Sequence, residues 1–127
     1  MARGAGEMDT TDGSAAGGVG LPTKAQDRKA IPIYSGVLRY FPLAISAVAD
    51  LSRVGNDQHN PGEPLHWARE KSTDELDACV RHLMEAGGRD VDGVRHSAKA
   101  AWRALANLQK EIEADGKPAG QLVNGET

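Results

Sequence analysis

The chain has 127 residues, a formal net charge of −3, 4% aromatic residues and one cysteine. This length suits one domain rather than two, and the negative charge excludes a general attraction to phosphate backbones, so no stable nucleic-acid partner is expected. The lone cysteine, Cys79, excludes an internal disulfide and the usual thiolate zinc site.

Residues 1–29 form the first segment, which is rich in Gly, Ala, Thr and Asp and has almost no branched apolar side chain. Such a segment buries too little apolar surface to offset the entropy lost on ordering, which predicts a disordered tail. It lacks the pattern of a signal peptide, and the chain has no run of about 18 apolar residues to cross a bilayer. We therefore expect a soluble, cytoplasmic protein without a membrane partner, a helical domain over residues 30–114 and a flexible tail over 115–127.

The segment "IPIYSGVLRYFP", at residues 31–42, contains two prolines and a glycine, which predicts extended chain or one short turn. Pro42 suits the first position of a helix, because its missing amide proton costs nothing there. Apolar residues then recur at three- and four-residue spacing until Val54, and Gly55 with Asn56 ends the pattern. The first helix is therefore predicted over residues 42–54.

A long loop is predicted next, from Gly55 to Lys71, with the sequence "GNDQHNPGEPLHWAREK". Long loops in compact domains are usually functional or disordered. Asn56 and His59 could line a nucleobase pocket, with Trp67 as its stacking surface. Trp67 could equally fold down over the core, and the sequence leaves both interpretations open.

The second helix is predicted from the stretch "KSTDELDACVRHL" at residues 71–83, where Ser72 and Glu75 have the spacing of a capping box. The double glycine at 87–88 ends this helix. Its apolar residues fall on one arc, which predicts a face turned towards the core. They are Leu76, Cys79, Val80, Leu83 and Met84.

The polar face of this helix could hold a metal and a phosphate. Asp74 and Asp77 lie three residues apart, so both carboxylates project from one face and could share a magnesium ion. Alternatively, the helix dipole favours acidic residues near the start, and Asp77 forms an ordinary ion pair with Arg81. Lys71 could meet a phosphate at the helix N-terminus, or could be a surface lysine.

The third helix is predicted to begin at Asp92 or Gly93 and to end before Gly116, because apolar residues alternate four and three apart over this range. The short connection "AGGRDVDG" favours an antiparallel pair with the second helix. That arrangement would bring His82, His96 and Asp92 into one polar cluster, although a lone histidine at such a boundary is more often simply hydrogen-bonded.

No strand pattern competes with these helices, so we predict an all-α fold, a small bundle of three to four helices. Its core rests on few large side chains, and small domains of this kind often need a partner chain. We therefore expect a homo-oligomer.

Two stretches resemble a known family: residues 31–83, ending in "RHL", and "DVDGVRHSAKAAWRAL" at residues 90–105. They are similar to the phage dATP/dGTP diphosphohydrolase-type domain, related to the all-α, MazG-like nucleotide pyrophosphohydrolases. The resemblance implies hydrolysis of a purine deoxynucleoside triphosphate, dGTP or dATP, to monophosphate and pyrophosphate with Mg²⁺ or Mn²⁺. If the protein is phage-encoded, this takes place in the cytoplasm of the bacterial host.

The resemblance carries over to His82, Asp92 and His96, whereas members often have a second histidine where this chain has Lys99. We combine these positions with those from helix spacing into one hypothesis. His82 and His96 are the catalytic candidates, and a metal is expected on Asp74, Asp77 and Asp92. Substrate is expected to contact Lys71, Arg81, Asn56, His59 and Trp67. The alternative is a small helical phage protein without enzymatic activity that binds a host protein or its own copies.

Overall fold

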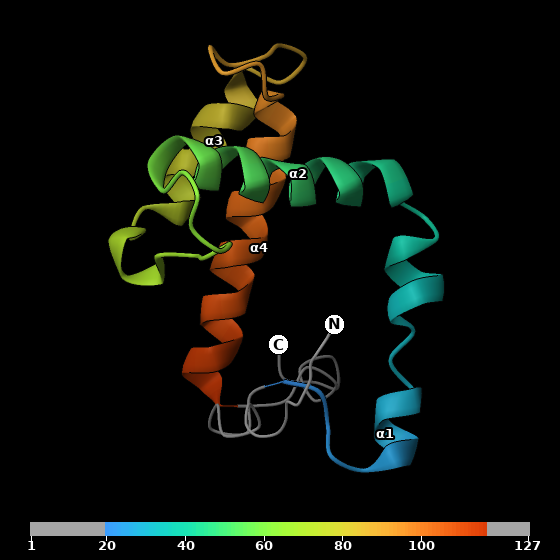
Figure 1. Cartoon of the computed structure of the whole chain (residues 1–127). Helices are drawn as coiled ribbons and strands as arrows, with labels where there is room; N and C mark the ends of the chain where they lie inside the picture. Colours follow the sequence, from blue (N-terminus) through green and yellow to red (C-terminus); the bar gives the residue numbers. More distant parts are fainter. Residues whose placement is uncertain (1–19, 117–127) are drawn as a thin grey trace. The chain divides into compact units, whose positions relative to one another are not determined.

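The computed structural model describes residues 20–116, and its elements are helical. They are α1 (Ala25–Lys29), the π-helical segment η2 (Tyr34–Leu38), α2 (Pro42–His59), the 3-10 segment η3 (Arg69–Lys71), α3 (Glu75–Met84) and α4 (His96–Asp115) (Figure 1). In residues 20–116 there is no strand, only an isolated bridge between Arg89 and Arg95. The predicted all-α class is confirmed. No single helix in this range is both long and apolar enough to cross a membrane.

The chain divides into two compact units, Met1–Pro32 with Gln109–Thr127 and Ile33–Leu108. In the first unit, α1 forms inside the segment predicted as a disordered tail, because its residues include good helix formers. The guanidinium of Arg28 donates to the carbonyl of Pro22 at 3.0 Å. The end of α4 before Gly116, at φ +69°, confirms that prediction. The remainder of both predicted tails, residues 1–19 and 117–127, lies outside the described residues.

In the second unit, α2 begins at Pro42 as predicted but continues to His59, so the predicted end at Gly55 is wrong. A glycine inside a helix costs only about 1 kcal/mol, which the rest of the helix can offset. The chain turns after Asn60, whose amide donates to the carbonyl of Asn56 at 2.7 Å. The side-chain amide of Asn56 also donates to the carbonyl of Glu63 at 2.8 Å. Asn56 and His59 therefore lie on a helix and not in a loop.

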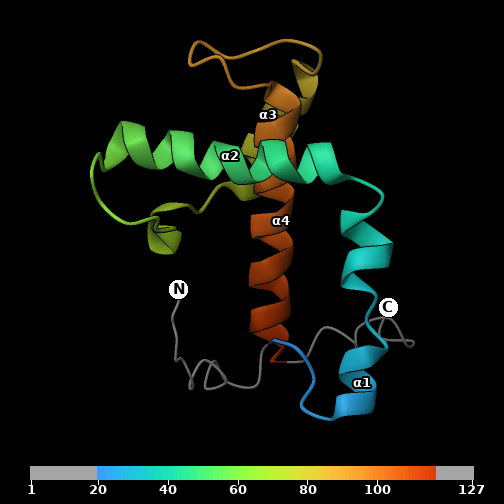
Figure 2. The same ribbon diagram turned by 45° about the vertical axis from the view of Figure 1, so that its right-hand side comes forward.

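Helices α3 and α4 form an antiparallel hairpin, as predicted. Two contacts fix its direction: Glu75, at the start of α3, contacts Arg103, whereas His82, near its end, contacts His96 at the start of α4. In both Figure 1 and Figure 2, α2 crosses the upper part of α4. A hydrogen bond from the indole of Trp102 on α4 to the hydroxyl of Ser52 on α2, at 3.1 Å, joins these two helices.

Both helices of the hairpin start later than the sequence predicts. The N-cap position of α3 is Asp74, so Ser72 does not occupy it, and the Ser72 hydroxyl donates to the Glu75 carboxylate at 2.5 Å. Helix α4 begins at His96, whereas Asp92 lies in a tight turn closed by a bond from the amide of Gly93 to the carbonyl of Asp90 at 2.9 Å. Gly93 has φ +83°, which glycine adopts at little cost.

The seam between α3 and α4 is built from small and polar side chains, contrary to the predicted apolar core face. Ala78 and Ala100 are 1% and 2% exposed, and Glu75 and His96 are also buried. The predicted apolar arc of α3 lies largely in solvent, with Leu76, Val80, Leu83 and Met84 all more than half exposed. The buried Glu75 finds its charged partner, Arg103, on α4, which keeps the polar face of α3 turned inward.

Two glycine substitutions should have opposite effects on stability. Gly93→Ala places a side chain at φ +83° and should lower the free energy of unfolding by roughly 1–2 kcal/mol. Gly55→Ala adds a Cβ with no atom within 4 Å in the middle of α2, and should raise it by up to about 1 kcal/mol. Urea denaturation followed by circular dichroism measures both. Shifts of the same sign would contradict the described turn or the described extent of α2.

Candidate active site

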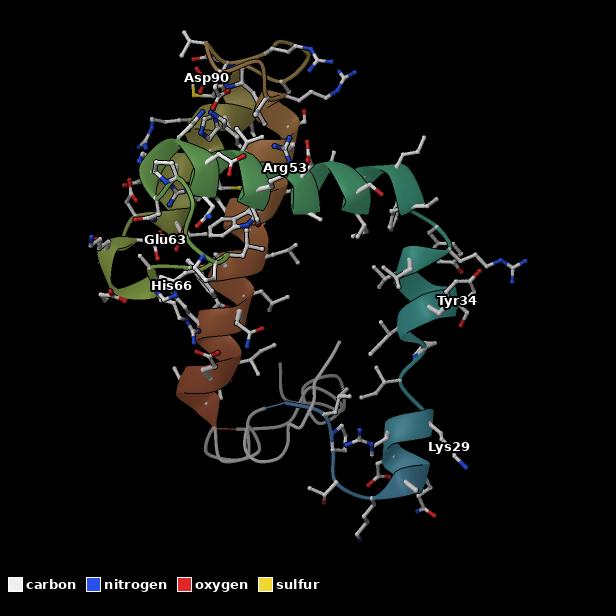
Figure 3. The ribbon with its side chains drawn as sticks, in the orientation of Figure 1. Lys29, Tyr34, Arg53, Glu63, His66 and Asp90 are labelled. Atoms are coloured by element: carbon white, nitrogen blue, oxygen red, sulfur yellow. The ribbon has the colours of Figure 1, made fainter. Side chains whose placement is uncertain are left out.

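A cavity of about 820 Å³ lies within the second unit, between the end of α2, the following loop, α3 and α4. Figure 3 shows the loop that carries Glu63 and His66 beside α4. The cavity brings together most of the residues that the sequence singles out. Those in its wall are Asn56, His59, Trp67, Lys71, His82 and Asp92.

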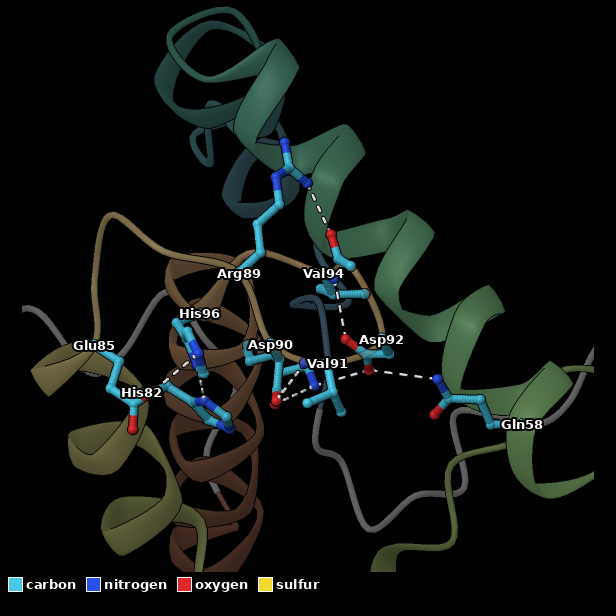
Figure 4. A network of polar contacts seen from close by, with 11 residues as sticks. Gln58, His82, Glu85, Arg89, Asp90, Val91, Asp92, Val94 and His96 are labelled. Atoms are coloured by element: carbon cyan, nitrogen blue, oxygen red, sulfur yellow. Dashed lines mark hydrogen bonds and ion pairs between the residues drawn. The ribbon is translucent and has the colours of Figure 1, made fainter.

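Two aspartates from one turn hold a lysine ammonium in this wall. Nζ of Lys99 lies 2.8 Å from Oδ2 of Asp90 and 2.9 Å from Oδ2 of Asp92. The turn orients both carboxylates, because Oδ1 of Asp90 accepts from the amide of Val91 and Oδ1 of Asp92 accepts from the amide of Val94 (Figure 4). Gln58, on the last turn of α2, donates to Asp92 at 3.4 Å. The turn is thus tied to both α2 and α4.

The charges of this group stabilise one another. The hydrogen bond from Lys99, followed by that from the Val94 amide, lowers the pKa of Asp92 to about 2. The same ammonium, with the Val91 amide, lowers the pKa of Asp90. Burial by itself lowers the pKa of Lys99, but the hydrogen bonds to Asp90 and Asp92 outweigh it and the pKa is raised. At neutral pH the group is therefore one ammonium between two carboxylates.

Two histidines meet beside this group. Nδ1 of His82 lies 2.9 Å from Nδ1 of His96, and Nε2 of His96 lies 3.1 Å from the carboxylate of Glu85 (Figure 4). When Nε2 of a neutral His96 donates to Glu85, its Nδ1 is left as an acceptor, so Nδ1–H of His82 must donate. Burial, followed by the charges of His96 and Lys99, lowers the pKa of His82. His82 is therefore neutral at physiological pH.

These histidines and Asp90 form the candidate metal site. Their ligand atoms all lie within 4.8 Å of one another, and no other group of at least three His, Cys, Asp or Glu residues in the described range meets this condition. The nitrogen separation of 2.9 Å is also about the distance between two adjacent ligands at roughly 2.1 Å from one cation. Two imidazoles and a carboxylate suit a transition metal better than Mg²⁺, which prefers oxygen.

The structure does not bring the predicted metal ligands Asp74, Asp77 and Asp92 together. Asp74 precedes α3 and pairs with Arg81 at 3.3 Å, and the Asp77 side chain is exposed. The predicted pair of Asp77 with Arg81 is thus replaced by one with Asp74. Arg81, predicted to bind substrate, is not in the cavity wall either. The cause is the antiparallel hairpin, which places Asp92, just before α4, near the end of α3, whereas Asp74 and Asp77 lie at its start.

Arg103 supplies a second cation to the cavity wall. It donates to Oε1 of Glu75 at 2.9 Å and to the hydroxyl of Ser72 at 2.8 Å. Glu75 is 5% exposed, so these contacts supply hydrogen bonds to a carboxylate that solvent barely reaches. With Lys71 and Lys99, Arg103 gives this wall three cationic side chains.

The wall also contains aromatic side chains, and the guanidinium of Arg103 lies 5.9 Å from the centroid of the Trp102 ring. Trp67 meets Trp102 edge to face, with ring centroids 5.5 Å apart, and the guanidinium of Arg69 lies 4.5 Å from the centroid of the Trp67 ring. Both tryptophans line the cavity, so Trp67 packs on a neighbour and also faces the cavity. Oδ1 of Asn56 is a buried acceptor with no hydrogen-bond partner among the described residues.

Sequence reasoning missed several residues of the site, namely Asp90, Arg103 and Trp102. A signal for them existed. His96, Lys99 and Arg103 follow a three- and four-residue spacing, which is a polar stripe along one face of a helix. Asp90 and Asp92 share one four-residue turn ending in Gly93, so both could have been expected near the start of that helix.

The protein is a small all-α domain with a cavity whose wall combines histidines, a carboxylate, cations and aromatic rings. Residues 22–118 match the family described as dATP/dGTP diphosphohydrolase, N-terminal, and the chain belongs to this family. The resemblance seen in the sequence is thereby confirmed. Neither the curated proteins nor the solved structures yielded a match.

The pKa of Asp92 leads to a pH-dependent prediction for stability. Its pKa falls from 3.8 to about 2 on folding, so its contribution is complete above pH 3.8 and is lost as the pH falls through 2. The free energy of unfolding of Asp92→Asn should therefore fall less than that of the wild type between pH 4 and pH 2. Asp57→Asn is the matched control, because Asp57 forms an exposed pair with Arg53. Urea denaturation at each pH measures this, and parallel curves for Asp92→Asn and wild type would contradict it.

Proposed function

We propose that this protein hydrolyses a purine nucleoside or deoxynucleoside triphosphate, such as dGTP or dATP, to monophosphate and pyrophosphate, in phage nucleotide metabolism. The family assignment supports the class of reaction. The observation that carries the proposal is the cavity, whose wall contains His82, the one member of the His82–Asp90–His96 group that lines it, together with cationic and aromatic side chains.

The size and lining of the cavity suit a nucleotide. Small-molecule sites usually measure about 300–1,000 Å³, and this one measures about 820 Å³. Trp67 and Trp102 offer aromatic surface to a base, and the side-chain amide of Asn56 in the same wall would contact its edge. Lys71, Lys99 and Arg103 would balance the charge of the phosphates.

We also propose a divalent cation, Mg²⁺ or Mn²⁺, as cofactor. His82, Asp90 and His96 would hold it, and the donor chemistry favours Mn²⁺ of the two. The cation would polarise a phosphoryl oxygen and lower the pKa of a bound water. Glu85 would orient His96 through Nε2, as carboxylates outside metal sites commonly do. In this arrangement the histidines predicted to be catalytic act as ligands, and the arginine and lysines stabilise charge that develops on the phosphates.

A second proposal concerns the apolar surface, which favours a homo-oligomer. In the described residues the buried apolar side chains are four alanines, and Leu83 and Leu105, on α3 and α4, are more than half exposed. A core this small stabilises a domain weakly, and covering the exposed side chains with a second copy would add apolar burial at about 25 cal/mol per Å². A non-enzymatic oligomer or host-binding protein would use the same surface.

The proposed reaction is tested by chromatography of products from a panel of dNTPs and NTPs with Mn²⁺ or Mg²⁺. We expect a purine monophosphate and pyrophosphate, and at least a hundredfold loss of rate in Asp90→Asn. Asp57→Asn, on an exposed ion pair of α2, is the control and should keep the wild-type rate. Asp77→Ala separates the two candidate metal sets: a large loss would favour the set predicted from helix spacing. A folded wild type with no turnover across the panel would favour the non-enzymatic function.

The oligomer is tested by size-exclusion chromatography with light scattering. The wild type should have at least twice the mass of the 13.4 kDa chain. The double variant Leu83→Glu with Leu105→Glu should shift towards the monomer, because charges replace apolar contacts at the proposed interface. Leu43→Glu, at a position 84% exposed on α2, is the control. A monomeric wild type would overturn the proposal.

A further inference from the structure

The structure points to a site for a single divalent cation of the class that accepts imidazole nitrogen, held by His82, Asp90 and His96, with the Lys99 ammonium occupying the place of a second cation. The role of this site in phosphate chemistry rests on the proposed function. The number and class of cations that it binds do not.

The three donors are close enough together to bind one ion. Nδ1 of His82 and Nδ1 of His96 lie 2.9 Å apart, and a carboxylate oxygen of Asp90 lies within 4.8 Å of both histidines' donor atoms. Nε2 of His96 is occupied by Glu85 at 3.1 Å, so its Nδ1 carries the lone pair that accepts from His82, and a cation would replace the proton between the two rings. The two imidazoles and the carboxylate can therefore converge on one ion.

The donor atoms determine the chemical class of that ion. Imidazole nitrogen is a poor ligand for Mg²⁺, which takes oxygen ligands and keeps several waters, whereas Mn²⁺, Co²⁺, Ni²⁺ and Zn²⁺ accept it. Two of the three donors are nitrogen. The site should therefore prefer these transition metals to Mg²⁺, with Co²⁺ bound more tightly than Mn²⁺.

The ammonium of Lys99 lies where a second cation would be held. Its ammonium contacts Oδ2 of both Asp90 and Asp92 at 2.8 and 2.9 Å, the lengths of charge-assisted hydrogen bonds. Its side chain is only 17% exposed, so the contact is part of the packed wall. In two-metal sites, cations about 3.5–4 Å apart are held close together by shared ligands. Here Asp90 belongs both to the candidate metal group and to the lysine, so Lys99 stands in the position of the second ion.

The positive charge of Lys99 opposes the binding of a second cation. An ammonium between Asp90 and Asp92 repels any further divalent cation that approaches the same two carboxylates, and a partly buried position screens that repulsion poorly. Removing the ammonium leaves two carboxylates of one turn facing each other without their cation. Such a pair of oxygen ligands is a ready site for a second metal ion.

The test uses the metal-free full chain and Co²⁺ as the probe, without nucleotide. Isothermal titration gives the number of ions per chain, and the visible absorption of Co²⁺ reports ligation by histidine. We expect one Co²⁺ per chain and an affinity for Mg²⁺ at least tenfold weaker. His96→Gln should weaken Co²⁺ binding at least tenfold, and the matched control His66→Gln, outside the donor group, should not. Two ions bound to the wild type, or no effect of His96→Gln, overturns the inference.

The lysine is tested by changing its charge. Lys99→Met should raise the number of Co²⁺ ions per chain from one to two, whereas Lys99→Arg, which keeps the charge, should remain at one. Circular dichroism tests whether each variant is folded. If Lys99→Met is unfolded, Lys99→Gln is used in its place. A neutral variant that is folded and still binds one ion overturns the assignment of Lys99.

A protein that binds one Co²⁺ but hydrolyses no nucleotide supports this inference and overturns the proposed function. Nucleotide hydrolysis by a protein that binds two Co²⁺ ions per chain supports the proposed function and overturns this inference.

Discussion

The polar seam between α3 and α4 is the constraint on which the site depends. Most helical hairpins bury their apolar faces, but here the contacts along the seam are Glu75 with Arg103 at one end and His82 with His96 at the other. Small side chains lie between these two contacts. A hairpin packed in this way turns its functional groups inward and leaves its apolar side chains on the outside, so the same geometry produces both the cavity and the exposed leucines.

The other wall of the cavity depends on the length of α2. Because the helix continues through Gly55 to His59, Asn56 and Gln58 project from a regular backbone. Gln58 then reaches the aspartate turn, and Asn56 holds the returning loop through the carbonyl of Glu63. Rigid elements position binding groups more accurately than loops do, which suits the proposed alignment of a base with a phosphate chain.

The sequence was informative where one local signal decides the outcome. Pro42 marks the start of α2 and Gly116 the end of α4, and the connection of α3 to α4 indicates the hairpin that brings His82 to His96. The prediction that the apolar arc of α3 faces the core was wrong, because periodicity identifies an apolar face but does not show which element packs against it. The register of the site was not predictable from spacing alone, since Arg103, Asp90 and Lys99 acquire their partners only through tertiary contacts.

The two alanines of the seam, Ala78 and Ala100, have a consequence for the whole hairpin. Each is almost completely buried and lies about one turn from both polar contacts of the seam, so no space is left there for a larger side chain. A larger side chain at either position would widen the gap between the helices and, with it, the distance between the two imidazoles. The spacing of the two imidazoles is therefore sensitive to side-chain volume at positions that carry no functional group.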